Sequence, residues 1–340
     1  MVIVPRLVPK RQSPQGDSDP LWAEAHVESY ALREDSDFLR AEARERSYAR
    51  VIFLLKLLAR LPLPVLHGLG IALGWVIYWS PGRHSGRMRK NVLDSGLCNP
   101  KHDCKRLLRV AIGEAGKGII ELLPVWLRPY DDVLKLVKGT SGWAHIDAAR
   151  TAGKGVIVIA PHIGCFEMIN LYYASQHPFT ALYKPPRKAV LNALMLAGRQ
   201  RGQARLVPTD LSGVRAQLAA LKRHEAIGIL PDQVASSGDG VWAPFLGRPA
   251  YTPTLTASLQ RKTGAAAFFV VAERLSWGRG YHLHVFPLSE DFPADKTEAA
   301  IRINRGVEDV VRQFPAQYLW SYNRHKRPGS APSPDSPVEA

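Results

Sequence analysis

The sequence predicts an α/β fold in which a mainly parallel mixed sheet is flanked by helices and preceded by an apolar helical segment. From residue 155 onward, β-branched runs alternate with helical segments of roughly 12–16 residues, which is typical of parallel strands joined by helices. The chain has 340 residues, 46% of them hydrophobic and 22% charged. This is ordinary for a globular protein and enough for one large domain with a sizeable core.

The predicted elements follow one another in a regular order. Strands are expected at residues 155–161, 179–185, 204–208, 226–233 and 265–275. Helices are expected at residues 162–176, 187–202, 211–225, 252–264 and 297–314, and a Gly-rich loop at 235–247. The alternating segment 280–288 is expected to be either an antiparallel neighbour or an edge strand.

An apolar stretch precedes the predicted sheet. Residues 61–82 carry no charge, and residues 51–61 carry only Lys56 and Arg60. Three prolines shorten this stretch below the roughly 20 residues that a spanning helix needs. We therefore predict a monotopic membrane contact over Val51–Trp79, with a buried helical hairpin and a true span as the alternatives. The glycines of GLGIALG miss the dinucleotide-binding pattern by one residue and follow no strand, which argues against a Rossmann site.

The charge is strongly positive and unevenly placed. There are 45 Lys and Arg against 30 Asp and Glu, a net charge of +15 with a pI near 9.9. Residues 1–50 are close to neutral, whereas residues 81–110 and 181–205 form two basic runs. Such an excess predicts an anionic partner. The runs flank apolar and strand-end segments and contain no known nucleic-acid module, so we expect no nucleic-acid partner.

These patterns divide the chain into four parts. We expect a poorly ordered extension at 1–46, the apolar membrane-associated helical segment at 47–82, the α/β domain at 83–329 and a disordered tail at 330–340. Three cysteines in 340 residues exclude a disulfide scaffold, and none has zinc-ligand spacing, so no metal site is expected.

Polar residues follow several predicted strands at the sheet edge where function usually lies. His162 comes directly after the first strand, and Glu167 follows five residues later. On a regular helix these two side chains point about 140° apart, so they meet only if His162 lies in a loop ahead of the helix. A carboxylate on one nitrogen would leave the other as a general base. The alternative is a surface His and Glu. No serine elbow is present, and Cys165 is expected to pack as a small apolar residue.

At this point the sequence resembles the lipid A biosynthesis acyltransferases, the lauroyl/myristoyl transferase family within the wider lysophospholipid acyltransferase superfamily. The resemblance covers about residues 47–329. It is carried in family order by GVIVIAPHIGCFE, YKP, GRQRG, LPDQ, FLGRPAYTPT and PAQYLWSYNRHKRP.

The resemblance implies roles for particular residues. His162 and Glu167 would be the catalytic dyad, with His162 as the base and Glu167 orienting the imidazolium. Arg199 would bind acceptor phosphate or the developing oxyanion, and Asp232 would hold Arg199 or the acceptor. Simple structural ion pairing is the alternative for both. The residues Tyr183 and Lys184 would line the same cleft.

The resemblance also implies a reaction and a location. An acyl chain would pass from acyl carrier protein or coenzyme A to a hydroxyl of a phosphorylated glycolipid, a lipid A precursor, by direct attack and without a cofactor. The enzyme would act at the cytoplasmic face of the bacterial inner membrane. A lysophospholipid, an ornithine lipid or a glycosylated phosphoinositide is the alternative acceptor.

Overall fold

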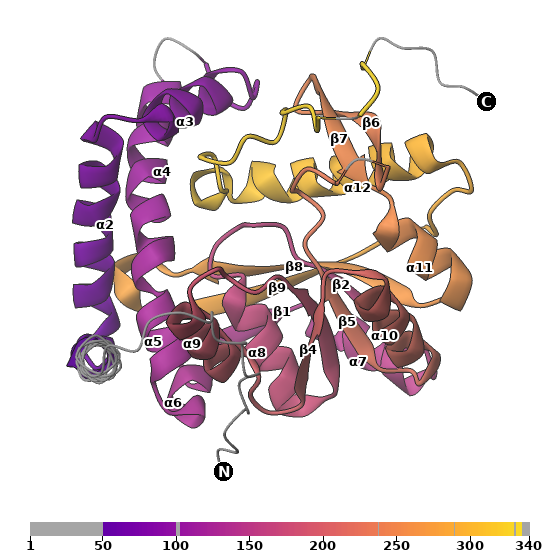
Figure 1. Cartoon of the computed structure of the whole chain (residues 1–340), viewed down its shortest axis with the longest axis horizontal. Helices are drawn as coiled ribbons and strands as arrows, with labels where there is room; N and C mark the ends of the chain where they lie inside the picture. The colour runs from indigo at the N-terminus through magenta and orange to yellow at the C-terminus, as the bar shows by residue number, and fades with distance from the viewer. Residues whose placement is uncertain (1–49, 100–102, 237, 289, 330, 335–340) are drawn as a thin grey trace, which may run out of the picture. The chain divides into compact units, whose positions relative to one another are not determined.

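A seven-stranded mixed sheet forms the centre of the compact unit Leu54–Ala340 (Figure 1). The computed structural model describes residues 50–99, 103–236, 238–288, 290–329 and 331–334. The strand order is β1-β9-β8-β2-β5-β3-β4. The parallel strands are β2 (Val156–Ile159), β3 (Phe179–Tyr183), β4 (Ala204–Pro208), β5 (Ala226–Ile229) and β8 (Ala266–Arg274). The prediction of a mainly parallel α/β sheet is confirmed.

Two strands run against the others. The alternating segment forms β9 (Tyr281–Pro287), which pairs antiparallel with β8, so the first of the two predicted alternatives holds. The edge position is taken instead by β1 (Val137–Ser141), which pairs parallel with β9. No strand is expected at this position from the sequence, because VKGTS is short and polar and has no apolar alternation.

Helices cover both faces of the sheet. The helices that follow strands along the chain are α7 (Trp143–Thr151), α8 (Glu167–Gln176), α9 (Ala189–Arg199), α10 (Leu211–Lys222), α11 (Leu255–Thr263) and α12 (Lys296–Gln313). Along β2, Ile157 and Ile159 pack with α10, α11 and α12, whereas Val156 and Val158 pack with α7 and α8. This alternation follows from the two-residue period of a strand and gives the sheet two buried faces.

The prediction of a Gly-rich loop at 235–247 is wrong in part. Residues 240–253 form a two-stranded hairpin of β6 (Gly240–Phe245) and β7 (Arg248–Pro253), which Figure 1 shows beside α12. Leu246 and Gly247, both at positive φ, make the two-residue turn, which is the geometry that a tight hairpin requires. Two prolines, at facing positions of the hairpin, mask the strand signal in the sequence.

The apolar segment forms two helices. Arg50–Ala59 is the first and α2 (Leu63–Trp79) the second. Within the described residues, neither helix has the length and apolar character to span a membrane by itself, although the two pass such a test as a sharply bent pair. The predicted membrane contact therefore stays a prediction.

One face of α2 packs closely on α4 (Asp103–Ile120), as Figure 1 shows. A Cβ on Gly116 would lie 1.9 Å from the carbonyl oxygen of Gly70, and one on Gly74 would lie 2.2 Å from the carbonyl oxygen of Ile112. The glycines of GLGIALG thus serve helix packing, which agrees with the rejection of a nucleotide site. The helix also leaves large apolar side chains exposed: Val65, Leu69, Ile71, Val76, Ile77 and Trp79.

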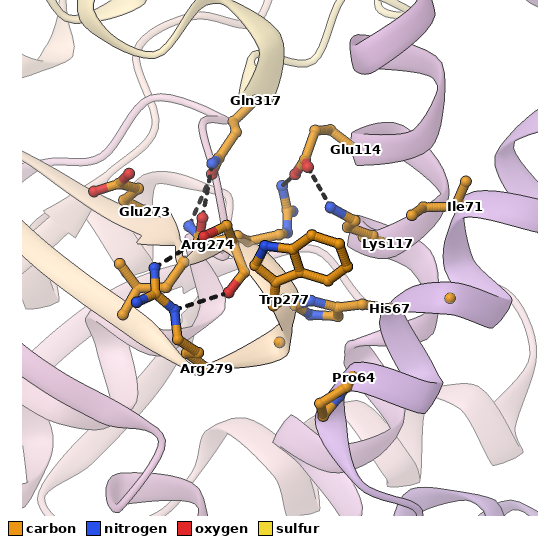
Figure 2. Close-up of a pocket in the computed structure, with 14 residues that line it drawn as sticks. Pro64, His67, Ile71, Glu114, Lys117, Glu273, Arg274, Trp277, Arg279 and Gln317 are labelled. Atoms are coloured by element: carbon orange, nitrogen blue, oxygen red, sulfur yellow. Dashed lines mark hydrogen bonds and ion pairs between the residues drawn. The ribbon is translucent and has the colours of Figure 1, made fainter.

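A cavity of about 570 Å³ lies where α2 and α4 meet the turn between β8 and β9 (Figure 2). This turn contains the short helix η1 (Ser276–Gly278). The remaining helices of the N-terminal half are α3 (Arg83–Leu93), α5 (Leu122–Leu127) and α6 (Tyr130–Leu134), and η2 (Pro315–Gln317) follows α12.

The cysteines and the chain ends complete the description. Cys98 and Cys104 form one disulfide at the start of α4, and Cys165 is buried in the core, as expected. The predicted extension 1–46 lies outside the described residues. Of the predicted disordered tail, residues 331–334 are described: Ala331 is buried, and Trp242 donates to the carbonyl of Pro332. The start of the tail is therefore packed rather than disordered.

Candidate active site

His162 stands in an irregular loop, residues 160–166, between the end of β2 and the start of α8. Its backbone N–H donates to Asp232 Oδ2 at 2.9 Å, and its ring Nδ1 contacts Asp232 Oδ1 at 2.8 Å. An ionised carboxylate only accepts hydrogen bonds, so the proton of the neutral ring lies on Nδ1. The other nitrogen, Nε2, is then an acceptor, and the side-chain amide of Gln233 lies 3.1 Å from it. This is the tautomer that a general base requires.

Asp232 is almost completely buried, with 3% of its surface exposed. Burial opposes its ionisation, but the charge and hydrogen bonds of His162, with a further contribution from Arg324, hold the pKa of its carboxyl below the usual value. Asp232 therefore remains negative at neutral pH and stabilises a positive charge on the His162 ring.

The carboxylate of Glu167 is bound to Arg199 instead of His162. Arg199 Nε donates to Glu167 Oε2 at 2.8 Å, Arg199 Nη2 donates to Oε1, and the indole N–H of Trp126 donates to Oε2 at 3.3 Å. Burial lowers the pKa of Arg199, but Glu167 more than offsets this and raises it above the usual value.

The expected partners are thus exchanged. We expected Glu167 to orient His162, and Asp232 to hold Arg199 or the acceptor; in the described hydrogen bonds, Asp232 contacts His162 and Glu167 holds Arg199. The reason is the strand order. β5 lies beside β2, which brings Asp232 next to His162, whereas Glu167 opens α8 and meets the last turn of α9.

His162, Glu167 and Arg199 line one cavity of about 370 Å³, and Asp232 adjoins it through its contact with His162. Tyr183 and Lys184 line it too, as predicted, and the Tyr183 hydroxyl donates to Asn192 Oδ1 at 2.7 Å. The rest of the lining is largely apolar and includes Phe166, Ile169, Phe179, Ala181, Leu182, Met195, Leu206, Ile229 and Leu230. The cavity therefore combines a few polar groups, including His162 and Arg199, with a largely apolar lining.

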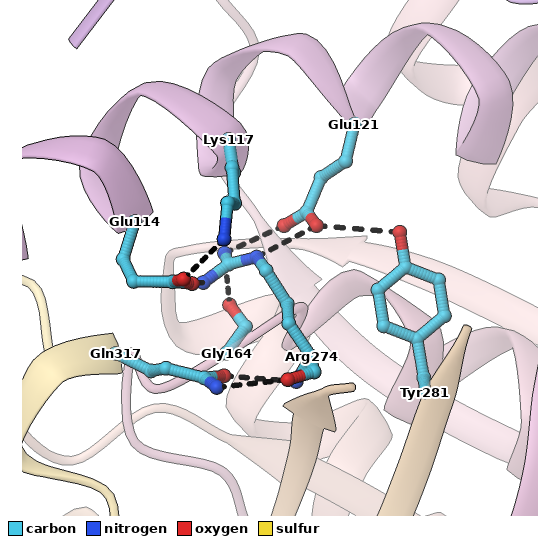
Figure 3. Close-up of polar contacts among 7 residues, drawn as sticks. All are labelled: Glu114, Lys117, Glu121, Gly164, Arg274, Tyr281 and Gln317. Atoms are coloured by element: carbon cyan, nitrogen blue, oxygen red, sulfur yellow. Dashed lines mark hydrogen bonds and ion pairs between the residues drawn. The ribbon is translucent and has the colours of Figure 1, made fainter. Parts of the chain in front are cut away.

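A buried network of charged residues supports the His162 loop (Figure 3). Arg274 at the end of β8 donates to both carboxylate oxygens of Glu121 at 2.7 Å and to the carbonyl of Gly164 at 2.7 Å. Gln317 exchanges two hydrogen bonds with the Arg274 backbone and accepts from Gly164 N–H through its own carbonyl. These contacts, together with isolated β-bridges from Ile163 to Tyr318 and from Gly164 to Ala272, fix the loop.

Sequence reasoning missed several of these contributors. Gln233 adjoins Asp232 in the quoted LPDQ block, so its place at a strand end was a usable signal. Arg274, Glu121 and Trp126 gave no local signal, because each reaches the site from a distant element. Among the described residues, no group of three His, Cys, Asp or Glu side chains is placed to hold a metal ion.

The fold and the site together define a class of protein: a mainly parallel α/β protein with a carboxylate-bound histidine and an arginine–glutamate pair at a largely apolar cavity. The chain belongs to the bacterial lipid A biosynthesis acyltransferase family, whose model matches residues 41–327. It is therefore an acyltransferase.

Individual relatives support this assignment. The chain is 28% identical over 271 residues to the lipid A biosynthesis palmitoleoyltransferase of Escherichia coli, covering 78% of this chain and 87% of that protein. It is 27% identical over 288 residues to the lipid A biosynthesis lauroyltransferase of Escherichia coli, covering 83% and 92%. It is also similar to the phosphatidylinositol mannoside acyltransferase of Mycobacterium tuberculosis, with 27% identity over 152 residues, which is 43% of this chain and 46% of that protein.

Proposed function

We propose that this chain transfers a fatty acyl group from a thioester donor, acyl carrier protein or coenzyme A, to a hydroxyl of a lipid A precursor. The observation that carries the proposal is the His162–Asp232 pair, which leaves Nε2 of the ring available at a cavity of mixed apolar and cationic character. The family and the two lipid A relatives favour a lipid A-type acceptor.

In this mechanism His162 Nε2 accepts the proton of the acceptor hydroxyl while the oxygen attacks the thioester carbonyl. The hydroxyl must displace the Gln233 amide from Nε2, because both need the same lone pair. An O–C bond forms and the C–S bond breaks. The imidazolium, stabilised by Asp232, then returns its proton to the departing thiolate. No acyl-enzyme is formed.

The remaining predicted residues have roles toward substrate. Glu167 holds the guanidinium of Arg199 at the cavity wall, where that arginine would bind acceptor phosphate or stabilise the oxyanion. Glu167 then acts through Arg199 rather than through the base. Tyr183 and Lys184 would contact the acceptor, and the apolar part of the cavity lining would take the acyl chain.

The surroundings suit a membrane substrate and an acidic donor protein. The exposed apolar side chains of α2, followed by the basic run 81–110, would bring the site to the cytoplasmic face of the inner membrane. The second basic run, 181–205, carries no acidic residue and would receive the acidic acyl carrier protein.

The test is a transfer assay with purified chain and several acceptors. Acyl carrier protein and coenzyme A thioesters are each offered with a lipid A precursor, a lysophospholipid, an ornithine lipid and a mannosylated phosphatidylinositol. We expect an acylated product from the lipid A precursor only. We expect no product with a His162→Ala protein whose circular dichroism matches that of the wild type. The mycobacterial relative makes the mannosylated lipid the alternative acceptor. Transfer to it alone would replace the proposed acceptor, and turnover by His162→Ala would reject the mechanism.

A further inference from the structure

His67 is a buried polar side chain without a partner. The residue is 4% exposed, and in the described structure neither ring nitrogen has a hydrogen-bond partner. It lies on α2 in the wall of the cavity between α2, α4 and the β8–β9 turn, and Figure 2 shows its ring directed into that space. Leaving a buried polar group unpaired costs about 1–3 kcal/mol. A ligand that enters the cavity would supply the missing hydrogen bond.

The charges around His67 favour an anion. Burial, reinforced by the positive charges of Lys117 and Arg274, lowers the pKa of His67 to about 4. The ring is therefore neutral at pH 7 and offers one N–H in a region of positive potential. The exposed Arg279 adds a cation at the rim of the cavity.

The two carboxylates in the lining are already engaged. Glu114 binds Lys117 at 2.5 Å and Arg274 at 3.3 Å, and Glu273 contacts the ring of His284 at 2.8 Å. Besides His67, the lining holds donors on Lys117, on the indole of Trp277 and on Arg279, which also donates to the carbonyl and the hydroxyl of Ser276. A lining with donors and engaged carboxylates favours a ligand whose polar part is negative.

The surface beside the cavity is apolar. Trp277, in the turn above it, is 88% exposed and has a positive φ of 61°, an arrangement that costs backbone strain. The turn packs against the start of α2, where a Cβ on Gly278 would lie 2.4 Å from the nitrogen of Pro64. Ile71 lines the cavity and is also one of the exposed apolar side chains of α2, so apolar surface of α2 adjoins the cavity. An exposed Trp beside such a surface is typical of the membrane interface.

We propose that this cavity binds the phosphate of an anionic membrane phospholipid, with the acyl chains along the exposed apolar side chains of α2 and Trp277 at the headgroup level. This lipid is not the acyl acceptor, and its site is separate from the His162 cavity. The proposal rests on the membrane contact in the proposed function, but not on the acyl-transfer chemistry.

The test is binding of the full chain to vesicles of phosphatidylcholine, with and without phosphatidylglycerol. His67→Leu replaces the unpaired ring by an apolar side chain. We expect its affinity for phosphatidylglycerol vesicles to fall about tenfold, the effect of one lost hydrogen bond to a charged group. Its binding to pure phosphatidylcholine should not change, and its melting temperature should stay equal or rise.

A second pair of variants, both at exposed positions, keeps the test valid if the His67 substitution impairs folding. Arg279→Gln removes the exposed cation at the rim, and Lys56→Gln removes one charge from the apolar segment outside the cavity lining. We expect the first to weaken binding to phosphatidylglycerol vesicles several-fold more than the second. Equal losses would reduce the effect to general surface charge and overturn the proposal.

Three other results would overturn it. His67→Leu could bind phosphatidylglycerol vesicles as the wild type does, or the wild type could bind both vesicle types equally. A rise in melting temperature with inorganic phosphate, abolished in His67→Leu without any vesicle preference, would assign the cavity to free phosphate. Acyl transfer by the wild type is measured separately with micellar acceptor, so a failure of the proposed reaction is distinguished from a failure of this site.

Discussion

Replacing Asp232 by Asn should reduce acyl transfer by about a thousandfold. The substitution keeps the size of the side chain and an oxygen for the backbone N–H of His162, but it removes the negative charge from a residue that is 3% exposed. With charge centres about 4 Å apart and an effective dielectric constant of about 20, the carboxylate stabilises the imidazolium by about 4 kcal/mol. Each 1.4 kcal/mol is tenfold in rate, so kcat should fall by about 10³.

The assay is steady-state kcat and KM for acyl transfer, with circular dichroism to verify folding. Glu167→Gln is the matched control, because it also removes one buried negative charge from the same cavity. It loosens Arg199, so we expect a loss of about tenfold or more in kcat/KM, mainly through KM. The reasoning is refuted if Asp232→Asn stays within tenfold of the wild-type kcat while Glu167→Gln loses a thousandfold.

Three further predictions concern stability. Gly116→Ala should destabilise the chain by about 1–3 kcal/mol in urea unfolding, because its Cβ would lie 1.9 Å from the Gly70 carbonyl oxygen. The control Gly68→Ala, whose Cβ would have nothing within 4 Å, should be neutral or stabilising. Equal effects of the two substitutions would contradict the contact between α2 and α4. Arg274→Leu should cost about 3–5 kcal/mol because it leaves the buried carboxylate of Glu121 without its cation, and a loss below 1 kcal/mol would contradict the network. In the unfolded chain His67 has its ordinary pKa of about 6.5, whereas in the folded chain its pKa is about 4. Lowering the pH from 6.5 to 4 should therefore reduce the stability of the wild type by roughly 3 kcal/mol relative to His67→Leu, because the unfolded chain binds the proton first. Parallel pH profiles of the two proteins would contradict it.

The sheet was predictable because its central strands are buried on both faces. Such strands appear as continuous apolar runs, and GVIVIAP and AAAFFVVAERL are of this kind. The strand β1 and the β6–β7 hairpin escaped prediction for the opposite reason. VKGTS has no apolar pattern, and the hairpin contains two prolines and positive φ at Leu246, which a local pattern does not indicate.

The candidate site was predictable in its members but not in its pairing. His162, Glu167, Arg199 and Asp232 all line or adjoin one cavity, because the carboxyl ends of parallel strands meet at one edge of a sheet. Which carboxylate contacts His162 depends on strand order, and this is a property of the folded sheet rather than of the spacing along the chain. The spacing of His162 and Glu167 allowed a contact only if His162 preceded the helix, and it was the family resemblance that implied their pairing.

The charge network that supports the His162 loop could not be predicted from the sequence. Arg274 and Glu121 are 153 positions apart and meet only because β8 ends against α4 and α5. His67 is a related case, since an unpaired ring inside an apolar helix has the same sequence signature as a core histidine. Only its burial and its lack of partners set it apart.

The most direct test of the central claim is mass spectrometry of lipid A from a strain that lacks this gene, complemented with wild-type chain or with His162→Ala. We predict lipid A short of one acyl chain in the deletion strain, restored by the wild-type chain and not by the variant. The mass difference gives the length of the transferred chain. Lipid A of unchanged mass after deletion, or full restoration by His162→Ala, would contradict the proposed acyl transfer.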